Sequence, residues 1–556
     1  MFENRASHLI ILAVAGFFAF FVHNGLIYPD IMESRNLITA REMVAYDNWL
    51  VPTMNGELRL EKPPLPTWIA AGLEQISPDH LVLQRAAAGV AALFLLLFLY
   101  LLGELLTGKR LYALIASLVF CTSVNAILTG RTATWDIYCH AFMLAAIYCL
   151  FRGVIRPGKN WGLFSLSGLL MGLSFLGKGP VSFYALLLPF LLVWGILYRP
   201  SLKGKAYPLL AAVGICLAVS VWWPVYLYVY HREAALAVWN KESAAWLSHN
   251  VRPWYYYWKF FVESGCWSLL LLTALYWPYW KKRLAFRKEY LFCVAWTLAV
   301  LAFLSFVPEK KNRYLFPVLI PAALTVAHVL HHWMVCFRGR RLPAGPDRWL
   351  YKINTWLLAV ISLALPVGVY LFFYREGDRT LGQFLPAGAL LSGVAGVLLY
   401  AAFRNRPALF LSGVVLLHIA SLGLLLPDIG SVFMNRERES IHRIRAVPET
   451  AGVPFYYPEE EGLRIELVYE AGRRIRPWDI RGEAFPEQLP IVLVSGKKAA
   501  ELLPPSLLEQ ADLREIGRYD DNWRPKTNRR YSQDFIKYVT LLYPRQQGHI
   551  PAKSEP

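Results

Sequence analysis

The chain has 556 residues, of which 56% are hydrophobic and 15% aromatic, and its mean hydropathy is +0.36. Soluble domains average about 45–50% apolar residues, so this composition excludes a water-soluble globular protein. The formal net charge is +18, but the basic residues gather in connections between apolar runs. That placement indicates membrane topology and argues against nucleic acid as a partner.

Apolar runs of roughly 18 to 25 residues, each able to cross a hydrocarbon core about 30 Å thick, predict about 13 transmembrane helices. They lie near residues 8–27, 82–106, 111–129, 134–152, 161–177, 180–198, 207–230, 262–280, 290–307, 314–336, 353–373, 382–403 and 407–426. The first run is interpreted as a retained anchor. With a cytoplasmic N-terminus, the basic clusters of the even connections fall inside and the region after residue 427 lies outside.

The predicted fold is therefore mainly α, a polytopic protein of the inner membrane with a periplasmic C-terminal domain. The transmembrane domain is predicted at residues 1–427, a small soluble α/β domain at 428–545 and a disordered tail at 546–556. Strands are predicted at 453–457, 464–469 and 491–495, with helix at 499–508. This domain contains no catalytic motif.

The first outer connection, residues 28–81, is polar although apolar runs flank it. Asp30 and Glu33 lie near its start, and Glu61-Lys62 precede two prolines near its end. Residues 33–46 have apolar side chains at helical spacing, which predicts an amphipathic helix in the membrane interface. A linker between two membrane helices does not require these charges, so this loop is the first candidate for the active site.

The second long outer connection, residues 231–261, has an amphipathic first half and an aromatic cluster at 255–258. The cluster is typical of an interfacial aromatic belt, with a sugar platform as the alternative. His249 is a candidate for acid/base chemistry, and an ordinary surface histidine is the alternative.

Two short outer connections also carry charge. Arg131 and Asp136 lie at the membrane surface, where an ionisable residue is a functional candidate; the alternative is a pair that caps helix ends. Lys178 follows a glycine and is a candidate anion-binding residue. The alternative is a lysine whose ammonium snorkels to the membrane interface.

The connection after the ninth run contains Lys310, Lys311 and Arg313 on the outer side, against the positive-inside rule. Phosphate is the natural partner of such cations, because Arg binds its oxygens bidentately and Lys serves as a point charge. Acids and cations on one membrane face suit transfer of a group from a phosphate leaving group. The cysteines show no metal-ligand spacing, so no metal site is predicted.

An ordered set of motifs resembles the GT-C membrane glycosyltransferases of the aminoarabinose (lipid A) transferase and protein O-mannosyltransferase type. The similarity covers most of the first 320 residues, in segments 33–43, 47–56, 61–64, 130–136, 176–180, 249–257 and 310–317. It implies transfer of a sugar, with inversion, from a polyprenyl-phosphate donor to a cell-envelope acceptor, without an essential cofactor or metal. The expected partners are membrane lipids, this donor and a lipid A-like lipid, glycan or protein acceptor.

The resemblance and the outer charges together assign expected roles. The expected catalytic acids are Glu33, Asp30 and Asp136; the expected donor phosphate-binding residues are Lys62, Arg131, Lys178, Lys310, Lys311, Arg313 and Tyr314; Arg35, Glu61 and His249 are expected near the acceptor or sugar.

The sequence departs from the family motif at one position, and this leaves open whether Asp30 or Glu33 is the catalytic acid. Met32 stands where the family has an aspartate, so either Asp30 takes that role or Glu33 acts alone with a changed acceptor. The alternative function is a lipid-linked saccharide transporter or flippase, and a non-catalytic interaction protein is a third. Charges at one outer surface and the lack of an internal repeat favour the enzyme.

Overall fold

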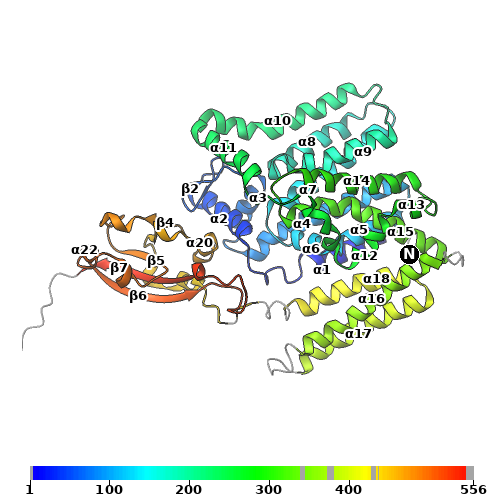
Figure 1. Ribbon diagram of the computed structural model, residues 1–556. Coiled ribbons are helices and arrows are strands. Elements are labelled where there is room, and N and C mark those ends of the chain that lie inside the picture. Colours follow the sequence, from blue (N-terminus) through cyan, green and yellow to red (C-terminus); the bar gives the residue numbers. More distant parts are fainter. Residues whose placement is uncertain (1–3, 339–344, 372–380, 428–433, 436, 546–556) are drawn as a thin grey trace, which may run out of the picture. The chain divides into compact units, whose positions relative to one another are not determined.

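The computed structural model describes residues 4–338, 345–371, 381–427, 434–435 and 437–545, and most of them are helical (Figure 1). The chain divides into two compact units. The first comprises residues 1–26 and 60–429, and the second comprises residues 27–59 and 430–556. The opening polar loop is thus divided between the units, and its first half belongs with the C-terminal region. The predicted tail, 546–556, lies outside the described residues.

The first unit is helical. Its α-helices are α1 (Arg5–Phe20), α3 (Leu65–Ile76), α4 (Leu81–Thr107), α5 (Arg110–Cys121), α6 (Val124–Gly130), α7 (Trp135–Ile155), α8 (Trp161–Lys178), α9 (Leu188–Tyr198), α10 (Ala206–Tyr230), α11 (Arg232–Ser248), α12 (Ser268–Ala274), α13 (Trp277–Trp280), α14 (Arg287–Phe306), α15 (Leu319–Arg338), α16 (Gly345–Val369), α17 (Leu381–Arg404) and α18 (Pro407–Ala420). Tighter or wider helical turns occupy Phe183–Leu187, Trp254–Trp267, Asn312–Val318 and Ser421–Leu425.

Eight helices within the described ranges are long and apolar enough to cross a membrane, or nine if α5 and α6, bent by 73°, form one span. The protein is therefore a multi-pass membrane protein. The other predicted spans fall on α1, α8, α9 and residues 254–280, which are not among these helices. The last of these breaks because Gly265 has a left-handed backbone, with φ of 62°. The count of about 13 stays a prediction.

Helix α7 is deeply buried in this unit; 89% of its apolar window is inside the protein. Small residues let its neighbour α8 approach closely, as is common between membrane helices. A Cβ added to Gly177 of α8 would lie 3.1 Å from the Cα of Cys139 on α7. This close approach brings the C-terminal end of α8 beside the first turns of α7.

The second unit combines α2 (Ile31–Tyr46) and a short hairpin, β1 (Thr53–Met54) and β2 (Glu57–Leu58), with a five-stranded sheet. The sheet order is β4-β3-β5-β7-β6, formed by β3 (Phe455–Pro458), β4 (Ile475–Trp478), β5 (Ile491–Ser495), β6 (Ala511–Asp520) and β7 (Ile536–Pro544). Strand β3 is parallel to β4 and β5, and the other pairs are antiparallel. Short helices α20 (Ile465–Ala471), α21 (Ala499–Leu502) and α22 (Pro505–Leu508) complete it.

One predicted strand is wrong. The sequence predicts an extended segment at 464–469, but residues 465–469 lie in α20, which Arg464 precedes as the N-cap and which is ended by Gly472 with φ of 76°. Buried Leu467 and Ala471 are four residues apart on this helix, and the alternation of polar and apolar residues was too short to distinguish a strand from a buried helical turn. Expected strands 453–457 and 491–495 correspond to β3 and β5, and the predicted helix 499–508 is split where Pro504 and Pro505 follow each other.

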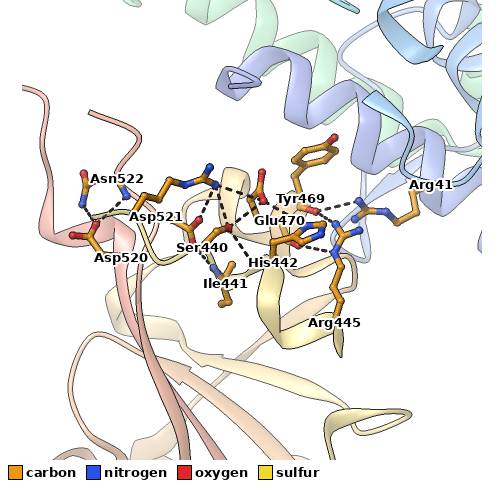
Figure 2. A network of polar contacts seen from close by, with 11 residues as sticks. Arg41, Ser440, Ile441, His442, Arg445, Tyr469, Glu470, Asp520, Asp521 and Asn522 are labelled. Carbon is orange, nitrogen blue, oxygen red and sulfur yellow. Dashed lines mark hydrogen bonds and ion pairs between the residues drawn. The ribbon is translucent and has the colours of Figure 1, made fainter. Parts of the chain in front are cut away.

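Helix α20 is tied to the start of the C-terminal region by a buried polar network (Figure 2). The carboxylate of Asp521 accepts hydrogen bonds from Arg438 Nη2 at 3.0 Å and from the Ile441 amide at 2.7 Å. Glu470 Oε2 lies 3.6 Å from Arg438 Nη2 and accepts from the Ser440 hydroxyl at 3.2 Å. Two largely buried carboxylates thus share one partly exposed guanidinium.

This network predicts a pH dependence of local stability. Burial raises the pKa of the Asp521 and Glu470 carboxyls above their ordinary values of 3.8 and 4.5. The folded state therefore binds the two carboxyl protons more tightly than the unfolded state does. The resulting stabilisation is complete at a pH below the ordinary pKa values, and it is lost as the pH rises through the raised pKa values of the folded state. We expect the Ile441 amide to be better protected from hydrogen exchange at about pH 4.5 than at about pH 7, after correction for intrinsic rates. Asp521→Asn should reduce that difference, and an unchanged difference would refute the assignment.

Candidate active site

A buried ion pair joins α7 and α8. Asp136 lies in the first turn of α7, Lys178 is the last residue of α8, and the Lys178 ammonium contacts the Asp136 carboxylate. The side chains are only 8% and 7% exposed. A charge at such a position requires a partner, because leaving it unpaired in a low dielectric is costly.

Tyr314 gathers three cations around its ring. Its centroid lies 5.0 Å from Lys178 Nζ, 5.6 Å from Arg313 Cζ and 5.8 Å from Lys311 Nζ. The face of an aromatic ring attracts cations, so the tyrosine helps to hold like charges close together. Glu309 balances part of this charge: its Oε1 lies 2.5 Å from Lys311 Nζ and accepts from the Tyr314 hydroxyl at 3.4 Å. The result is a concentrated positive site bordered by two carboxylates.

Residues 250–257 are fixed to the cationic segment 308–311. The Lys310 amide donates to the Asn250 carbonyl, and the Arg252 amide donates to the Pro308 carbonyl, each at 3.2 Å. The Tyr257 hydroxyl bonds both the amide and the carbonyl of Lys311, at 3.1 and 3.2 Å. Residues 250–257 therefore set the backbone path of the lysines.

The structure gives His249 and Lys310 different surroundings. His249 is exposed, next to the Asn250 carbonyl that holds the cationic segment. Lys310 is 4% exposed, and its ammonium donates to the Val307 carbonyl at 2.5 Å. Both roles stay predictions.

The Lys62 side chain contacts helix α11. Its ammonium forms an ion pair with Glu242 at 3.1 Å, and the preceding Glu61 pairs with Lys241 at 3.1 Å. Two consecutive residues of α11 thus bind two consecutive residues before α3. If Lys62 binds the donor phosphate as predicted, that phosphate competes with the Glu242 carboxylate for the ammonium.

We expect Glu242→Gln to lower the KM for a polyprenyl-phosphate donor by about two- to fivefold, since a partly exposed ion pair contributes about 0.2–1 kcal/mol. Steady-state kinetics of the purified protein measure this. Lys241→Gln is the matched control, because it breaks the neighbouring pair without touching Lys62, and should leave KM unchanged. A higher KM for Glu242→Gln would show that the pair supports donor binding and does not oppose it.

Arg131 caps the end of α1. Its guanidinium donates to the carbonyls of Ala19, at 2.8 Å, and of Val22. It is 3% exposed. The ion pair with Asp136 that the sequence left as an alternative is replaced by the Asp136–Lys178 pair, and phosphate binding by Arg131 stays a prediction.

The acids of the opening loop lie in the second unit, on α2. Asp30 is the N-cap, and its Oδ1 accepts from the amides of Met32 and Glu33, both at 2.9 Å. Glu33, in the first turn, is fully buried. Arg35 is half-buried, and its carbonyl accepts from the Thr39 hydroxyl at 2.7 Å.

Sequence reasoning missed His140. It lies one turn beyond Asp136 on the same face of α7, is 1% exposed, and contacts the ring of Phe316 at a centroid distance of 5.5 Å. Its Nδ1 makes no hydrogen bond to another described residue. The spacing of four residues from Asp136 was the available signal. Glu242, Glu309 and Tyr257 were also missed, because their roles depend on contacts between distant segments.

The first unit therefore concentrates positive charge around Tyr314, and the second carries a buried carboxylate, Glu33, on a capped helix. Among the described residues, no three His, Cys, Asp or Glu side chains gather closely enough to hold a metal ion. The expected independence of a metal stays a prediction.

Comparison with known proteins places this geometry in a class. Residues 61–224 match the family described as dolichyl-phosphate-mannose-protein mannosyltransferase. Over 96% of this chain and 97% of the other, the fold is similar to that of crystalline ArnT from Cupriavidus metallidurans bound to undecaprenyl phosphate, with a TM-score of 0.66 and 15% identity. This chain therefore shares the fold of that solved protein.

Two curated relatives are more similar in sequence. An uncharacterised protein of Aquifex aeolicus is 28% identical over 57% of this chain and 60% of its own length. The undecaprenyl phosphate-alpha-4-amino-4-deoxy-L-arabinose arabinosyl transferase 1 of Pseudomonas fluorescens is 28% identical over 76% of this chain and 74% of its own length. The alignment with the first thus spans less than two thirds of that relative. The predicted resemblance to the aminoarabinose transferase and protein O-mannosyltransferase type is confirmed.

Proposed function

We propose that the protein is an integral-membrane inverting glycosyltransferase that moves a sugar from a polyprenyl-phosphate donor to a cell-envelope acceptor. The observation that carries this proposal is the buried Asp136–Lys178 pair beside the cations around Tyr314. The fold shared with a protein crystallised with undecaprenyl phosphate supports it. We place the reaction at the outer face of the inner membrane, with about 13 spans, a cytoplasmic N-terminus and a periplasmic C-terminal domain.

In this proposal the donor phosphate binds the cations around Tyr314, with Lys62 as a further contact. The acceptor oxygen attacks the anomeric carbon, the bond from that carbon to the phosphate oxygen breaks, and polyprenyl phosphate leaves. Fixed cations stabilise the charge that develops on the leaving phosphate. Asp136 orients Lys178 for this task, since the ion pair fixes the ammonium against Tyr314.

For the acceptor we propose Glu33 as the acid that acts. The carboxylate of Asp30 is already used to cap α2, so its contribution is to fix the turn that carries Glu33. A hydroxyl acceptor gives up a proton to a general base, whereas an anionic phosphate acceptor such as that of lipid A needs mainly positioning. A lipid A-like lipid, another glycan or protein Ser/Thr all fit this scheme.

Mass spectrometry of envelope lipids and glycoproteins from a deletion strain tests the proposal and names the acceptor. We expect one sugar-modified species to disappear, to return with the wild-type chain and to stay absent with Lys178→Met. Unchanged glycoconjugates would overturn the proposal. The alternative is a lipid-linked saccharide flippase. It has less support, because the Pseudomonas fluorescens relative is named as an arabinosyl transferase. The solved protein of similar fold, from Cupriavidus metallidurans, was crystallised with undecaprenyl phosphate.

A further inference from the structure

Helix α2 is bound by the C-terminal region through Glu42. This carboxylate is 4% exposed in its side chain and accepts three hydrogen bonds through Oε2. The donors are Arg474 Nη2 at 2.7 Å, the Thr53 hydroxyl at 2.6 Å and the Gly56 amide at 3.2 Å. Glu42 therefore joins α2, the β1–β2 hairpin and the residue before β4.

Arg474 contacts α2 in two ways, through the charge and through the flat face of its guanidinium. Its Nη2 also donates to the Thr53 hydroxyl at 3.1 Å. Its guanidinium lies 3.5 Å from the ring centroid of Tyr46, the last residue of α2. One side chain thus fixes the C-terminal end of the helix, and a planar guanidinium does so with defined geometry.

Asn55 attaches the hairpin to the sheet. Strand β4 is at one edge of the five-stranded sheet. The side-chain Nδ2 of Asn55 donates to the Ile475 carbonyl at 2.7 Å, and its Oδ1 accepts from the backbone N–H of Ile475 at 2.8 Å. This pair of bonds imitates a neighbouring strand at the first residue of the edge strand.

Arg41 of α2 and Tyr28, which precedes the helix, make further contacts with the C-terminal region. The Arg41 guanidinium donates to the Tyr469 carbonyl at 3.1 Å (Figure 2) and lies 5.5 Å from that ring. Arg438 lies 4.4 Å from the ring of Tyr28, just before the helix. Most of these contacts are directional hydrogen bonds, which fix the rotation of a helix more tightly than apolar packing does.

We propose that the C-terminal region is part of the catalytic apparatus: it positions the acid-bearing helix α2 through its own Arg474 and through the hydrogen bonds that Asn55 of the hairpin makes to β4. The two residues are positioning residues, because they act on Glu33 through the helix and need not touch substrate. This inference rests on the proposed function. It assigns a task to a domain in which the sequence shows no catalytic motif.

The test compares two arginines of the same segment. Arg474→Met removes the contact with α2, whereas Arg476→Met removes an exposed ion pair with Glu487 at 2.7 Å on β4. In the purified full chain, we expect Arg474→Met to lower kcat on the order of 10²-fold with donor KM within about twofold, since small misplacements of a reacting group have effects of this size. Arg476→Met should retain kcat, and Arg474→Lys should recover part of it.

Asn55→Ala is a second test that does not remove a charge. Like Arg474→Met, it should lower kcat. Hydrogen exchange of residues 31–46 tests the contact without any transfer reaction: it should rise in Arg474→Met and Asn55→Ala and stay unchanged in Arg476→Met. Unchanged exchange and kcat in the first two, or equal losses in all three, would overturn the inference. A wild-type chain that transfers no sugar while exchange behaves as expected would instead refute the proposed function.

Discussion

Replacing Lys178 by methionine is expected to abolish sugar transfer and to destabilise the protein. The substitution leaves the Asp136 carboxylate buried without its cation, which costs about 3–5 kcal/mol. It also removes a positive charge from the site around Tyr314, and loss of one such electrostatic group lowers kcat by about 10²–10³. Thermal unfolding in detergent and the rate per folded molecule measure the two effects separately.

The double variant Asp136→Asn/Lys178→Met separates structure from chemistry. It removes both charges, so most of the stability should return while transfer stays lost. Lys205→Met is a matched control: Lys205 is also buried, and its ammonium donates to the Gly153 carbonyl at 2.8 Å near the other end of α7. This control should destabilise the protein but retain the rate per folded molecule. Recovery of transfer in the double variant would remove the ion pair from the catalytic account.

Glu33→Gln is expected to lower kcat by about 10²–10⁴ with a hydroxyl acceptor, the range for loss of a general base. Donor KM should stay within about twofold, because the donor cations are unchanged. Kinetics with a labelled donor and the acceptor found in vivo measure this.

Asp30→Asn distinguishes the two acids. Asparagine still caps a helix, so the start of α2 should be retained and kcat should change little. Asp30→Ala should cost about 1 kcal/mol of stability through the lost cap. If Asp30→Asn abolished transfer while Glu33→Gln did not, Asp30 would be the acid and the proposed assignment would be wrong.

Hydropathy located the membrane helices because length and apolar content are local properties. It could not locate their breaks: α5 and α6 bend by 73°, and Gly265 interrupts the run at 262–280. The strand predicted at 464–469 failed for a related reason, since a short buried helix such as α20 shows the same short apolar pattern as a strand.

The charged candidates of the site were visible as residues, but their partners were not. Asp136 and Lys178 are 42 positions apart, and only the close packing of Gly177 against α7 brings them together. The partners of Arg131 were hidden in the same way, because its bond to the Ala19 carbonyl of α1 reaches more than 100 positions along the chain. The attachment of α2 to the C-terminal region likewise depends on pairs such as Glu42 and Arg474, which no local pattern reveals.

Reconstitution tests the central claim most directly. Purified protein in proteoliposomes is supplied with a polyprenyl-phosphate-linked labelled sugar and an envelope extract, and both the labelled product and the released polyprenyl phosphate are measured. The account predicts that product and free polyprenyl phosphate form in equal amounts, and that both are lost in Lys178→Met and in Asp136→Asn/Lys178→Met. Movement of the intact donor across the bilayer without a covalent product would contradict it.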